Sequence, residues 1–239
     1  MHHPLDNKIA IVTGAGKGIG RATALALARE GASLVIASRT MADLQSLAKE
    51  IGNLGRKALP FEADLTRESE IKRLVQETAS KFGGIDILVN NAGIGRFGRI
   101  EDLSTLDWDE MFEINLRSMF ICTREALPYL KRRPESFIIN VASLAGKNAF
   151  IGGAGYAASK WGVLAFSKCL MLEERKAGVR VLAICPGSVD THFFQHPSLP
   201  KPDRSKILRP EDVAETIVHA IKLPHNAMVS EIDIRPTNP

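Results

Sequence analysis

Short apolar runs alternate along this chain with longer segments in which apolar residues recur every three to four positions. The short runs predict buried β-strands, and the longer segments predict helices that pack one apolar face against a sheet. Strands are expected at 8–14, 33–38, 57–64, 86–93, 136–143, 180–187 and 229–234. Helices are expected at 18–30, 41–52, 67–82, 105–131, 154–176 and 210–222, and Thr105 is the expected N-cap of the longest one.

The predicted strands are nearly continuous apolar runs joined by helices, which is typical of a parallel sheet covered on both faces. No Pro/Ser-rich linker divides the chain and no segment repeats, so residues 1–239 are expected to form one domain. The least regular stretch is 188–209, which holds two Phe, two His and three Pro. Such a stretch favours a loop that covers a substrate.

The composition is that of an ordinary globular protein, with 45% hydrophobic and 24% charged residues. The net charge of +4 is mild. The densest cationic cluster, residues 131–133, is expected at a helix end, where cations suit the helix dipole. We therefore expect no nucleic-acid partner. No apolar run approaches the length of a membrane span, so no membrane partner is expected either.

Three cysteines, Cys122, Cys169 and Cys185, lie far apart within apolar segments. Their number and spacing fit neither a disulfide framework nor a metal site, so no metal is expected. Buried, reduced thiols in a cytoplasmic protein are the natural interpretation. The first residues, MHHPLDNK, contain no apolar region of the kind found in signal peptides.

Unusual residues stand at the carboxyl ends of six predicted strands. In open parallel sheets, ligands bind outside the carboxyl ends of the strands, so these residues are expected to line one crevice. They are the glycine-rich loop 14–20, Ser38-Arg39, Asp64, the Asn-Asn-Ala-Gly segment 90–93, Ser143 and Pro186-Gly187.

The glycine-rich loop follows the first strand and has the pattern G-x-x-x-G-x-G, with Gly14, Gly18 and Gly20 at the glycine positions. Glycines permit a tight turn and let the backbone approach a pyrophosphate, which then sits at the N-terminus of the next helix. An ordinary glycine-rich turn would have a similar composition. The position between the first strand and the first helix favours a dinucleotide site.

Residues after the second strand indicate which dinucleotide is bound. A site for unphosphorylated NAD needs an acid about 20 residues further on, which accepts a hydrogen bond from the ribose 2′-hydroxyl. That place holds Ser38 and Arg39 and no acid. The Arg39 guanidinium suits a 2′-phosphate, and a bound phosphate would explain Lys17 at a helix N-terminus. Both could be solvated surface cations, but together they favour NADP(H).

Together these motifs resemble one family, the short-chain dehydrogenases/reductases, in the compact branch similar to 3-oxoacyl-acyl-carrier-protein reductases and carbonyl reductases. The resemblance covers about residues 6–234 and implies a Rossmann-type, doubly wound parallel sheet of about seven strands with helices on both faces. The matching positions are T-G-x-x-x-G-x-G at 13–20, N-N-A-G at 90–93, Asn115, Ser143, Y-x-x-x-K at Tyr156 and Lys160, and Pro186-Gly187 followed by Thr191.

This resemblance implies an oxidoreductase that transfers a hydride between NADPH and a ketone, aldehyde or 3-oxoacyl substrate. The implied catalytic residues are Asn115, Ser143, Tyr156 and Lys160, with Tyr156 as the proton donor or acceptor. The cofactor contacts that it implies are Gly14, Gly18, Ile19, Gly20, Asp64, Leu65, Asn91, Ala92, Gly93, Tyr156, Lys160, Pro186, Gly187, Val189 and Thr191. Lys17, Ser38 and Arg39 are further expected contacts, because of the charges described above.

The spacing of Tyr156 and Lys160 places both on one face of a helix. Free tyrosine has a pKa of about 10, and a pKa near 7 would need roughly 4 kcal/mol of preference for phenolate. A cation about 4 Å away supplies that amount only in a sheltered site, where Lys160 is expected to lower the Tyr156 pKa. Ser143 is expected to donate a hydrogen bond to the carbonyl oxygen. By resemblance, Asn115 marks a local distortion of its helix.

Apolar residues near the active face favour an apolar ketone or 3-oxoacyl substrate over a sugar. Pocket candidates, each of which could instead anchor the core or a loop, are Phe97, Leu144, Phe150, His192, Phe193 and Phe194. The helix around 156–172 is apolar on more than one side, which favours a homo-oligomer, either a tetramer or a dimer. Its apolar residues are Trp161, Val163, Leu164, Phe166, Leu170 and Leu172.

Two other functions remain as alternatives. A silent NADP-sensing or scaffold protein would usually lack part of the tyrosine–lysine pair, which is complete here. A sugar-nucleotide epimerase or dehydratase would need a larger C-terminal substrate region than 239 residues provide. The ending EIDIRPTNP replaces the glycine-rich ending common in the family, so the substrate stays open.

Overall fold

The computed structural model describes residues 3–195 and 203–237 of the chain. Seven parallel strands form one sheet in the order β3-β2-β1-β4-β5-β6-β7, which confirms the doubly wound α/β architecture. The order reverses between β1 and β4, so the ends of these two strands form the topological switch point. The strands are β1 (Ile9–Thr13), β2 (Ser33–Ser38), β3 (Ala58–Glu62), β4 (Ile87–Asn90), β5 (Ser136–Val141), β6 (Val179–Pro186) and β7 (Glu231–Ile234).

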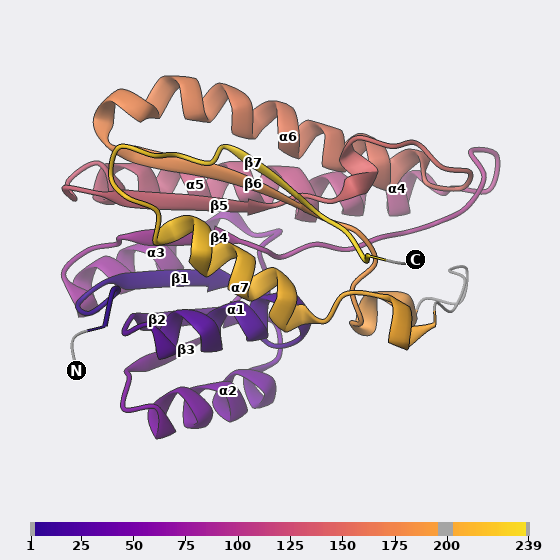
Figure 1. The fold of residues 1–239 in the computed structure, drawn as a ribbon. Helices are drawn as coiled ribbons and strands as arrows, with labels where there is room; N and C mark the ends of the chain where they lie inside the picture. The colour runs from indigo at the N-terminus through magenta and orange to yellow at the C-terminus, as the bar shows by residue number, and fades with distance from the viewer. Residues whose placement is uncertain (1–2, 196–202, 238–239) are drawn as a thin grey trace.

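Helices cover both faces of this sheet (Figure 1). Helices α1, α2 and α7 pack on one face, and α3, α5 and α6 pack on the other. Their bounds are α1 (Gly18–Arg29), α2 (Met41–Asn53), α3 (Glu68–Phe82), α4 (Thr105–Phe112), α5 (Ser118–Leu130), α6 (Ala154–Glu174) and α7 (Pro210–Ile221). Most expected elements therefore exist, with ends that differ by up to three residues.

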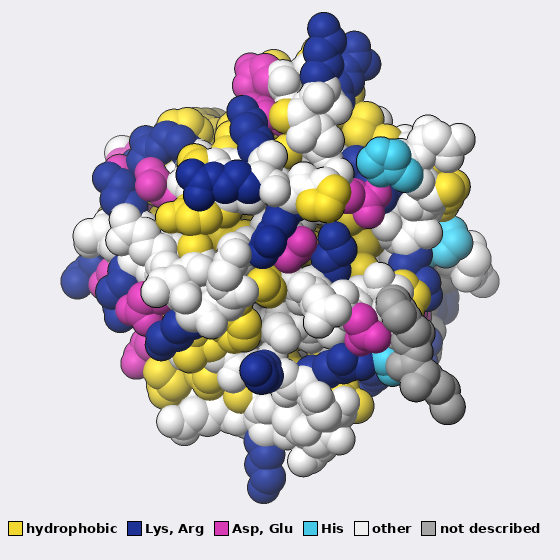
Figure 2. All heavy atoms as spheres, turned by 90° about the vertical axis from the view of Figure 1, so that its left-hand side faces the viewer, with side chains coloured by type: hydrophobic (Ala, Val, Ile, Leu, Met, Phe, Trp, Pro, Cys, Tyr) yellow, Lys and Arg dark blue, Asp and Glu magenta, His cyan; other side chains and the backbone are white. Residues whose placement is uncertain are grey.

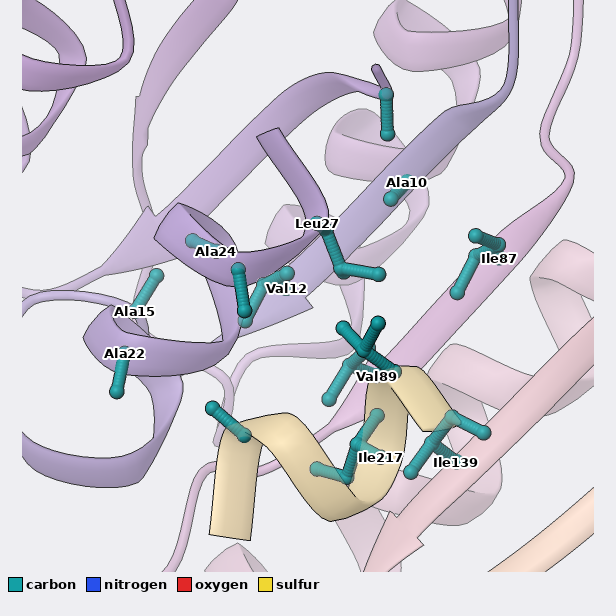
Figure 3. Packing of buried hydrophobic residues seen from close by; sticks show 14 of the residues in the cluster. Ala10, Val12, Ala15, Ala22, Ala24, Leu27, Ile87, Val89, Ile139 and Ile217 are labelled. Carbon is teal, nitrogen blue, oxygen red and sulfur yellow. The ribbon is translucent and has the colours of Figure 1, made fainter. Parts of the chain in front are cut away.

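The core is divided between the two faces because successive strand residues point to opposite sides. In β1, Ala10 and Val12 pack with Leu27 of α1 and Ile217 of α7, as Figure 3 shows. Ile11, between them in the sequence, packs in the cluster on the opposite face. These side chains are fully buried, as expected for a strand in the interior of the sheet with helices on both faces. The glycine-rich loop follows directly after the carboxyl end of β1.

The long helix expected at 105–131 is wrong as a single α-helix. It consists of α4, a π-helical turn at Glu113–Arg117, and α5. The expected N-cap is wrong by one residue: the Ser104 hydroxyl, not Thr105, accepts a hydrogen bond from the Asp107 N–H at 3.0 Å. The π-helical turn contains Asn115, so the helix distortion implied by the family resemblance is present.

One cysteine differs from expectation. Cys122 and Cys185 are buried, but Cys169 is exposed because it lies on the side of α6 that faces away from the sheet. The expected substrate loop at 188–209 is only partly within the described residues. Val189 and Leu208 form an isolated bridge that ties its two ends together, and residues 196–202 lie outside the description.

The face where the strands begin carries mixed charges. Figure 2 shows Lys and Arg side chains beside Asp and Glu side chains on this face. There, the buried Asp86 carboxylate lies 3.5 Å from the Lys8 ammonium and 3.5 Å from the Arg133 guanidinium. Within the described residues, no helix is long and apolar enough to cross a membrane.

Candidate active site

A cavity of about 910 Å³ runs along the carboxyl ends of all seven strands. The strand ends expected to line one crevice therefore line one continuous cavity. Every sequence-predicted cofactor contact except Gly20 and Asp64 lines it. Among the predicted catalytic residues Ser143, Tyr156 and Lys160 line it, whereas Asn115 lies behind its wall.

The glycine-rich loop forms the wall above β1. Gly14 and Gly18 adopt positive φ angles of 62° and 55°, which favour glycine. Gly20 lies beneath the loop, where a Cβ would come within 2.4 Å of both the Gly14 carbonyl oxygen and the Asn91 amide nitrogen. That amide donates hydrogen bonds to the carbonyls of Thr13 at 2.9 Å and Gly14 at 3.1 Å. Asn91 thus holds the loop against the end of β4.

The end of the cavity beside β2 contains an acid that sequence reasoning missed. Asp43, in the first turn of α2, lines the cavity with Ser38 and Arg39. Its carboxylate lies 3.5 Å from the Lys17 ammonium, so Lys17 already has an anionic neighbour within the protein. Arg39 is exposed at the rim. The sequence did not predict this ion pair, because Lys17 and Asp43 are 26 positions apart (43 − 17 = 26) and only the folded chain brings them together.

Asp64 does not line the cavity, although its two chain neighbours do. Its carboxylate accepts hydrogen bonds from the backbone and hydroxyl of Thr66 at 3.0 and 2.8 Å. These bonds lower the pKa of Asp64, and the Arg67 cation adds to the effect. Ala63 and Leu65, on either side of Asp64, line the cavity instead.

Tyr156 and Lys160 come from the first two turns of α6, next to the ends of β5 and β6. The Lys160 ammonium donates a hydrogen bond to the Val141 carbonyl at 2.8 Å and lies 5.9 Å from the centre of the Tyr156 ring. The Ser143 hydroxyl follows β5, accepts a hydrogen bond from the Ala145 N–H at 3.1 Å, and lies near enough to the Tyr156 hydroxyl to influence its pKa. The three predicted side chains therefore meet at the centre of the cavity.

Burial shifts the pKa of both members of the tyrosine–lysine pair. It raises the pKa of Tyr156 to about 12, although the neighbouring Ser143 hydroxyl acts in the opposite direction. It lowers the pKa of Lys160 to about 8. The expected lowering of the Tyr156 pKa is thus wrong for this structure. The site is sheltered, as that argument required, but removal of the phenolate from water outweighs the nearby cation.

Asn115 joins three elements behind this site. Its carbonyl oxygen accepts a hydrogen bond from the Ile94 N–H at 2.8 Å. Its amide nitrogen donates to the Ile94 carbonyl and to the Ser159 hydroxyl, each at 2.9 Å. A Cβ on Gly93 would lie 3.2 Å from the Asn115 carbonyl oxygen and 3.4 Å from the Lys160 ammonium. Asn115 therefore fixes the segment after β4 against α6, beside Lys160.

Aromatic rings cover Tyr156. The ring centres of Phe97 and Phe193 each lie 5.4 Å from that of Tyr156 and 5.6 Å from one another. Phe150 adds a third ring, 6.1 Å from Phe97. All three line the cavity, as do the predicted Leu144 and His192. The Phe194 side chain lies outside the described part of the chain.

Two further cavity residues, Arg235 and Pro236, follow β7 and were not predicted as site residues. A signal for them was present, because the strand-end rule applies to the seventh strand as well as to the first six. Within the described residues, no group of side chains is arranged to hold a metal ion.

Residues 8–200 match the protein family described as short chain dehydrogenase. Among curated relatives, an uncharacterised oxidoreductase of Staphylococcus aureus strain MRSA252 is 35% identical over 232 residues, which cover 97% of this chain and 98% of the relative. A 3-oxoacyl-acyl-carrier-protein reductase of Thermotoga maritima is 35% identical over 223 residues, which cover 90% of each chain.

Two solved structures are similar over nearly their whole length. An alcohol dehydrogenase of the archaeon Thermococcus sibiricus, complexed with 5-hydroxy-NADP, is 31% identical and superposes with a TM-score of 0.89 over 96% of this chain and 97% of its own. A metagenomic short-chain oxidoreductase in complex with NADP is 32% identical, with a TM-score of 0.86 over 98% of this chain and 99% of its own.

Proposed function

The chain belongs to the short-chain dehydrogenase family of oxidoreductases, and from this premise we propose that it reduces the carbonyl group of a small molecule with NADPH. The observation that carries the proposal is the meeting of Ser143, Tyr156 and Lys160 in a buried pocket at the centre of the cavity. The catalytic tyrosine is 9% exposed and the lysine 4% exposed, so both act away from bulk water.

The glycine-rich loop fits a dinucleotide because it presents backbone where a side chain would block approach. Gly14 and Gly18 would hold the pyrophosphate together with Ile19, at the N-terminus of α1. When bound, the nicotinamide supplies the hydride that reduces the carbonyl carbon. The remaining proposed contacts are Ala63 and Leu65 at the adenine, Asn91, Ala92 and Gly93 along the strand ends, Lys160 at the ribose, and Pro186, Gly187, Val189 and Thr191 at the nicotinamide.

We assign the preference for NADPH over NADH mainly to Arg39. Its guanidinium can bind a 2′-phosphate through two parallel hydrogen bonds. Lys17 contributes less than the sequence suggested, because Asp43 already offsets part of its charge. Two relatives of known structure were solved with NADP or a derivative of it, which supports the same choice.

Tyr156 is suited to donate a proton to the carbonyl oxygen. Because its pKa is raised to about 12, the hydroxyl keeps its proton at neutral pH. The Ser143 hydroxyl can donate a hydrogen bond to the same oxygen as negative charge develops there. The Lys160 cation, 5.9 Å from the ring, stabilises the phenolate that remains after proton transfer. Asn115 acts as a positioning residue that holds the wall beside Lys160.

The wall around Tyr156 favours apolar carbonyl substrates. Phe97, Phe150 and Phe193 supply flat apolar surfaces next to the reacting group. A ketone or 3-oxoacyl compound can pack against them, whereas a sugar would leave its hydroxyls without partners. The activity of the Thermotoga maritima relative, a 3-oxoacyl-acyl-carrier-protein reductase, is compatible with this class.

The proposal is tested by following the loss of reduced-nicotinamide absorbance with a panel of ketones, aldehydes and 3-oxoacyl thioesters. We expect turnover with NADPH, a lower rate with NADH, and a much smaller dissociation constant for NADPH than for NADH. Equal dissociation constants would contradict the role of Arg39. Tight NADPH binding without turnover of any carbonyl compound would instead support a silent NADP-sensing protein.

A further inference from the structure

The chain that follows β7 is fixed against the substrate end of the cavity. The Gly187 N–H donates a hydrogen bond to the Ile234 carbonyl at 2.8 Å. A Cβ on Gly187 would lie 3.2 Å from the Pro236 ring, so the two backbones pack closely. Arg235 lies between these two anchors and lines the cavity. Its backbone position is therefore set by the sheet.

The strand register places Arg235 near the reacting groups and far from the glycine-rich loop. Val141 pairs with Ile184, and Pro186 pairs with Ile234, so Ser143, Pro186 and Ile234 stand in one row across the strand ends. Two strand spacings separate the β5 end from the β7 end, which is about 10 Å. A long arginine side chain can span most of that distance.

The charges around Arg235 leave an excess cation. Its guanidinium donates to one oxygen of Asp233 at 3.2 Å, and the Lys147 ammonium contacts the other oxygen. Lys147 also contacts Glu231, and Lys168 lies 3.5 Å from Glu231. Three cations thus share two carboxylates, which leaves one positive charge (3 − 2 = 1). The Arg235 side chain is 55% exposed, so some of its guanidinium N–H groups can donate hydrogen bonds to a ligand.

The cavity wall at this end offers nothing to balance that charge. Among the described residues that line the cavity, the one acid is Asp43, which lies beside β2 at the far end and next to Lys17. The lining next to Arg235 includes the apolar side chains of Leu144 and Pro236, which lie on either side of Gly187. One net positive charge beside apolar surface attracts an anion more strongly than the same charge in open water does.

We propose that Arg235 is a specificity-determining residue that binds a carboxylate on the substrate. The preferred substrates are then carbonyl compounds that carry a carboxylate, with an apolar body between the two groups. A guanidinium binds a carboxylate through two parallel hydrogen bonds, and one excess positive charge matches the single negative charge of a carboxylate. This inference rests on the proposed carbonyl reduction and adds the class of substrate.

The test compares phenyl ketones that carry a terminal carboxylate with their neutral methyl esters, at several chain lengths between ketone and carboxyl carbon. For the wild type with NADPH, we expect kcat/KM to favour the acid over its ester at one or more lengths. Arg235→Gln should lower kcat/KM for the acid by roughly 10- to 100-fold, the range of a charge-assisted hydrogen bond, and leave the ester unchanged. Arg235→Lys should recover part of the loss.

The control variant is Arg132→Gln, which removes an exposed cation after α5. Its neighbour Arg133 contacts Asp86 just before β4, so Arg132 lies at the end of the sheet where the strands begin, away from the cavity. It should leave both substrates unaffected. If Arg235→Gln lowers turnover of acid and ester alike, Arg235 is structural and the inference is wrong. A wild type that reduces the esters at least as well as the acids would also overturn it, while the proposed function would stand.

Two further results distinguish a failure of the proposed function from a failure of the inference about Arg235. A wild type that reduces no member of the panel would contradict the proposed function itself. A matching phosphonate tests the charge of the bound group: if Arg235 favours the phosphonate, which can carry two negative charges, over the carboxylate, the assignment to a carboxylate is wrong.

Discussion

Lys160 is a buried cation, and its cost to the fold can be measured. Burial lowers its pKa from 10.5 to about 8, so the folded protein holds this proton less tightly than the unfolded chain does. Each pKa unit corresponds to about 1.36 kcal/mol. Below pH 8 the lysine is charged in both states, and its burial lowers the free energy of unfolding by up to about 3 kcal/mol.

We predict that Lys160→Met abolishes activity but raises the free energy of unfolding at pH 7 by up to about 3 kcal/mol. Between pH 8 and pH 10.5 the unfolded wild type binds more protons than the folded one, so the wild type gains stability as pH rises and the difference shrinks. Urea titrations of both proteins at several pH values measure this. A variant that is less stable than the wild type at pH 7 would show that the hydrogen bond to Val141 outweighs the cost of burial.

At the scale of residues, the sequence predicted those site residues that lie close together in the chain, because their spacing alone indicates that they share one helix face or one loop. Tyr156 and Lys160 are four apart on a helix, and the glycines of the loop lie within seven consecutive residues, 14–20. It could not predict Asp43 as a neighbour of Lys17. That contact requires β2, α2 and the glycine-rich loop to pack together, and they pack closely around Gly16, where a Cβ would lie 3.1 Å from the Ser38 hydroxyl and 3.2 Å from the Asp43 Cβ.

At the scale of elements, apolar periodicity predicted where helices and strands lie but not how one helix is distorted. The pattern over 105–131 continues without a break, because a π-helical turn changes hydrogen bonding more than it changes which side chains are apolar. The π-helical turn contains Asn115, whose bonds reach the backbone of Ile94 in a different segment. Only the family resemblance indicated a distortion there.

The C-terminal strand was predicted as an element, but its contribution to the site was not. Without the sheet order, nothing in EIDIRPTNP shows that Ile234 pairs with Pro186 and so brings Arg235 to the cavity. The ion pairs of Asp233 and Glu231 with Lys147 likewise join β7 to the segment after Ser143, 84 residues away in the sequence in the case of Glu231 (231 − 147 = 84).

At the scale of the whole molecule, the outer face of α6 remains apolar. Trp161 and Leu172 on this face are 54% and 57% exposed, and the exposed Phe120 ring of α5 lies beside Phe166 of α6. A single helix that covers a sheet needs one apolar stripe, so this second apolar surface supports a contact with another copy of the chain. Cys169 is exposed on the same helix, so the predicted burial of this cysteine is wrong for the single chain.

We predict that the protein is a dimer or tetramer at micromolar concentration, as measured by light scattering. Leu172→Glu should shift it toward smaller species, because a charge would be buried without a partner. Leu54→Glu, at an exposed leucine after α2, is the matched control and should leave the mass unchanged. A monomeric wild type at micromolar concentration would show that the α6 face has another role.

The central claim is that Tyr156 supplies the proton in an NADPH-dependent carbonyl reduction. The most direct test is the steady-state rate of Tyr156→Phe beside that of the wild type, with the same ketone and with NADPH binding measured in parallel. We expect kcat to fall by roughly 10²- to 10⁴-fold, the usual contribution of a general acid, with NADPH binding nearly unchanged. Substantial residual kcat in Tyr156→Phe would contradict the account and point to another donor, of which His192 in the cavity wall is the first candidate.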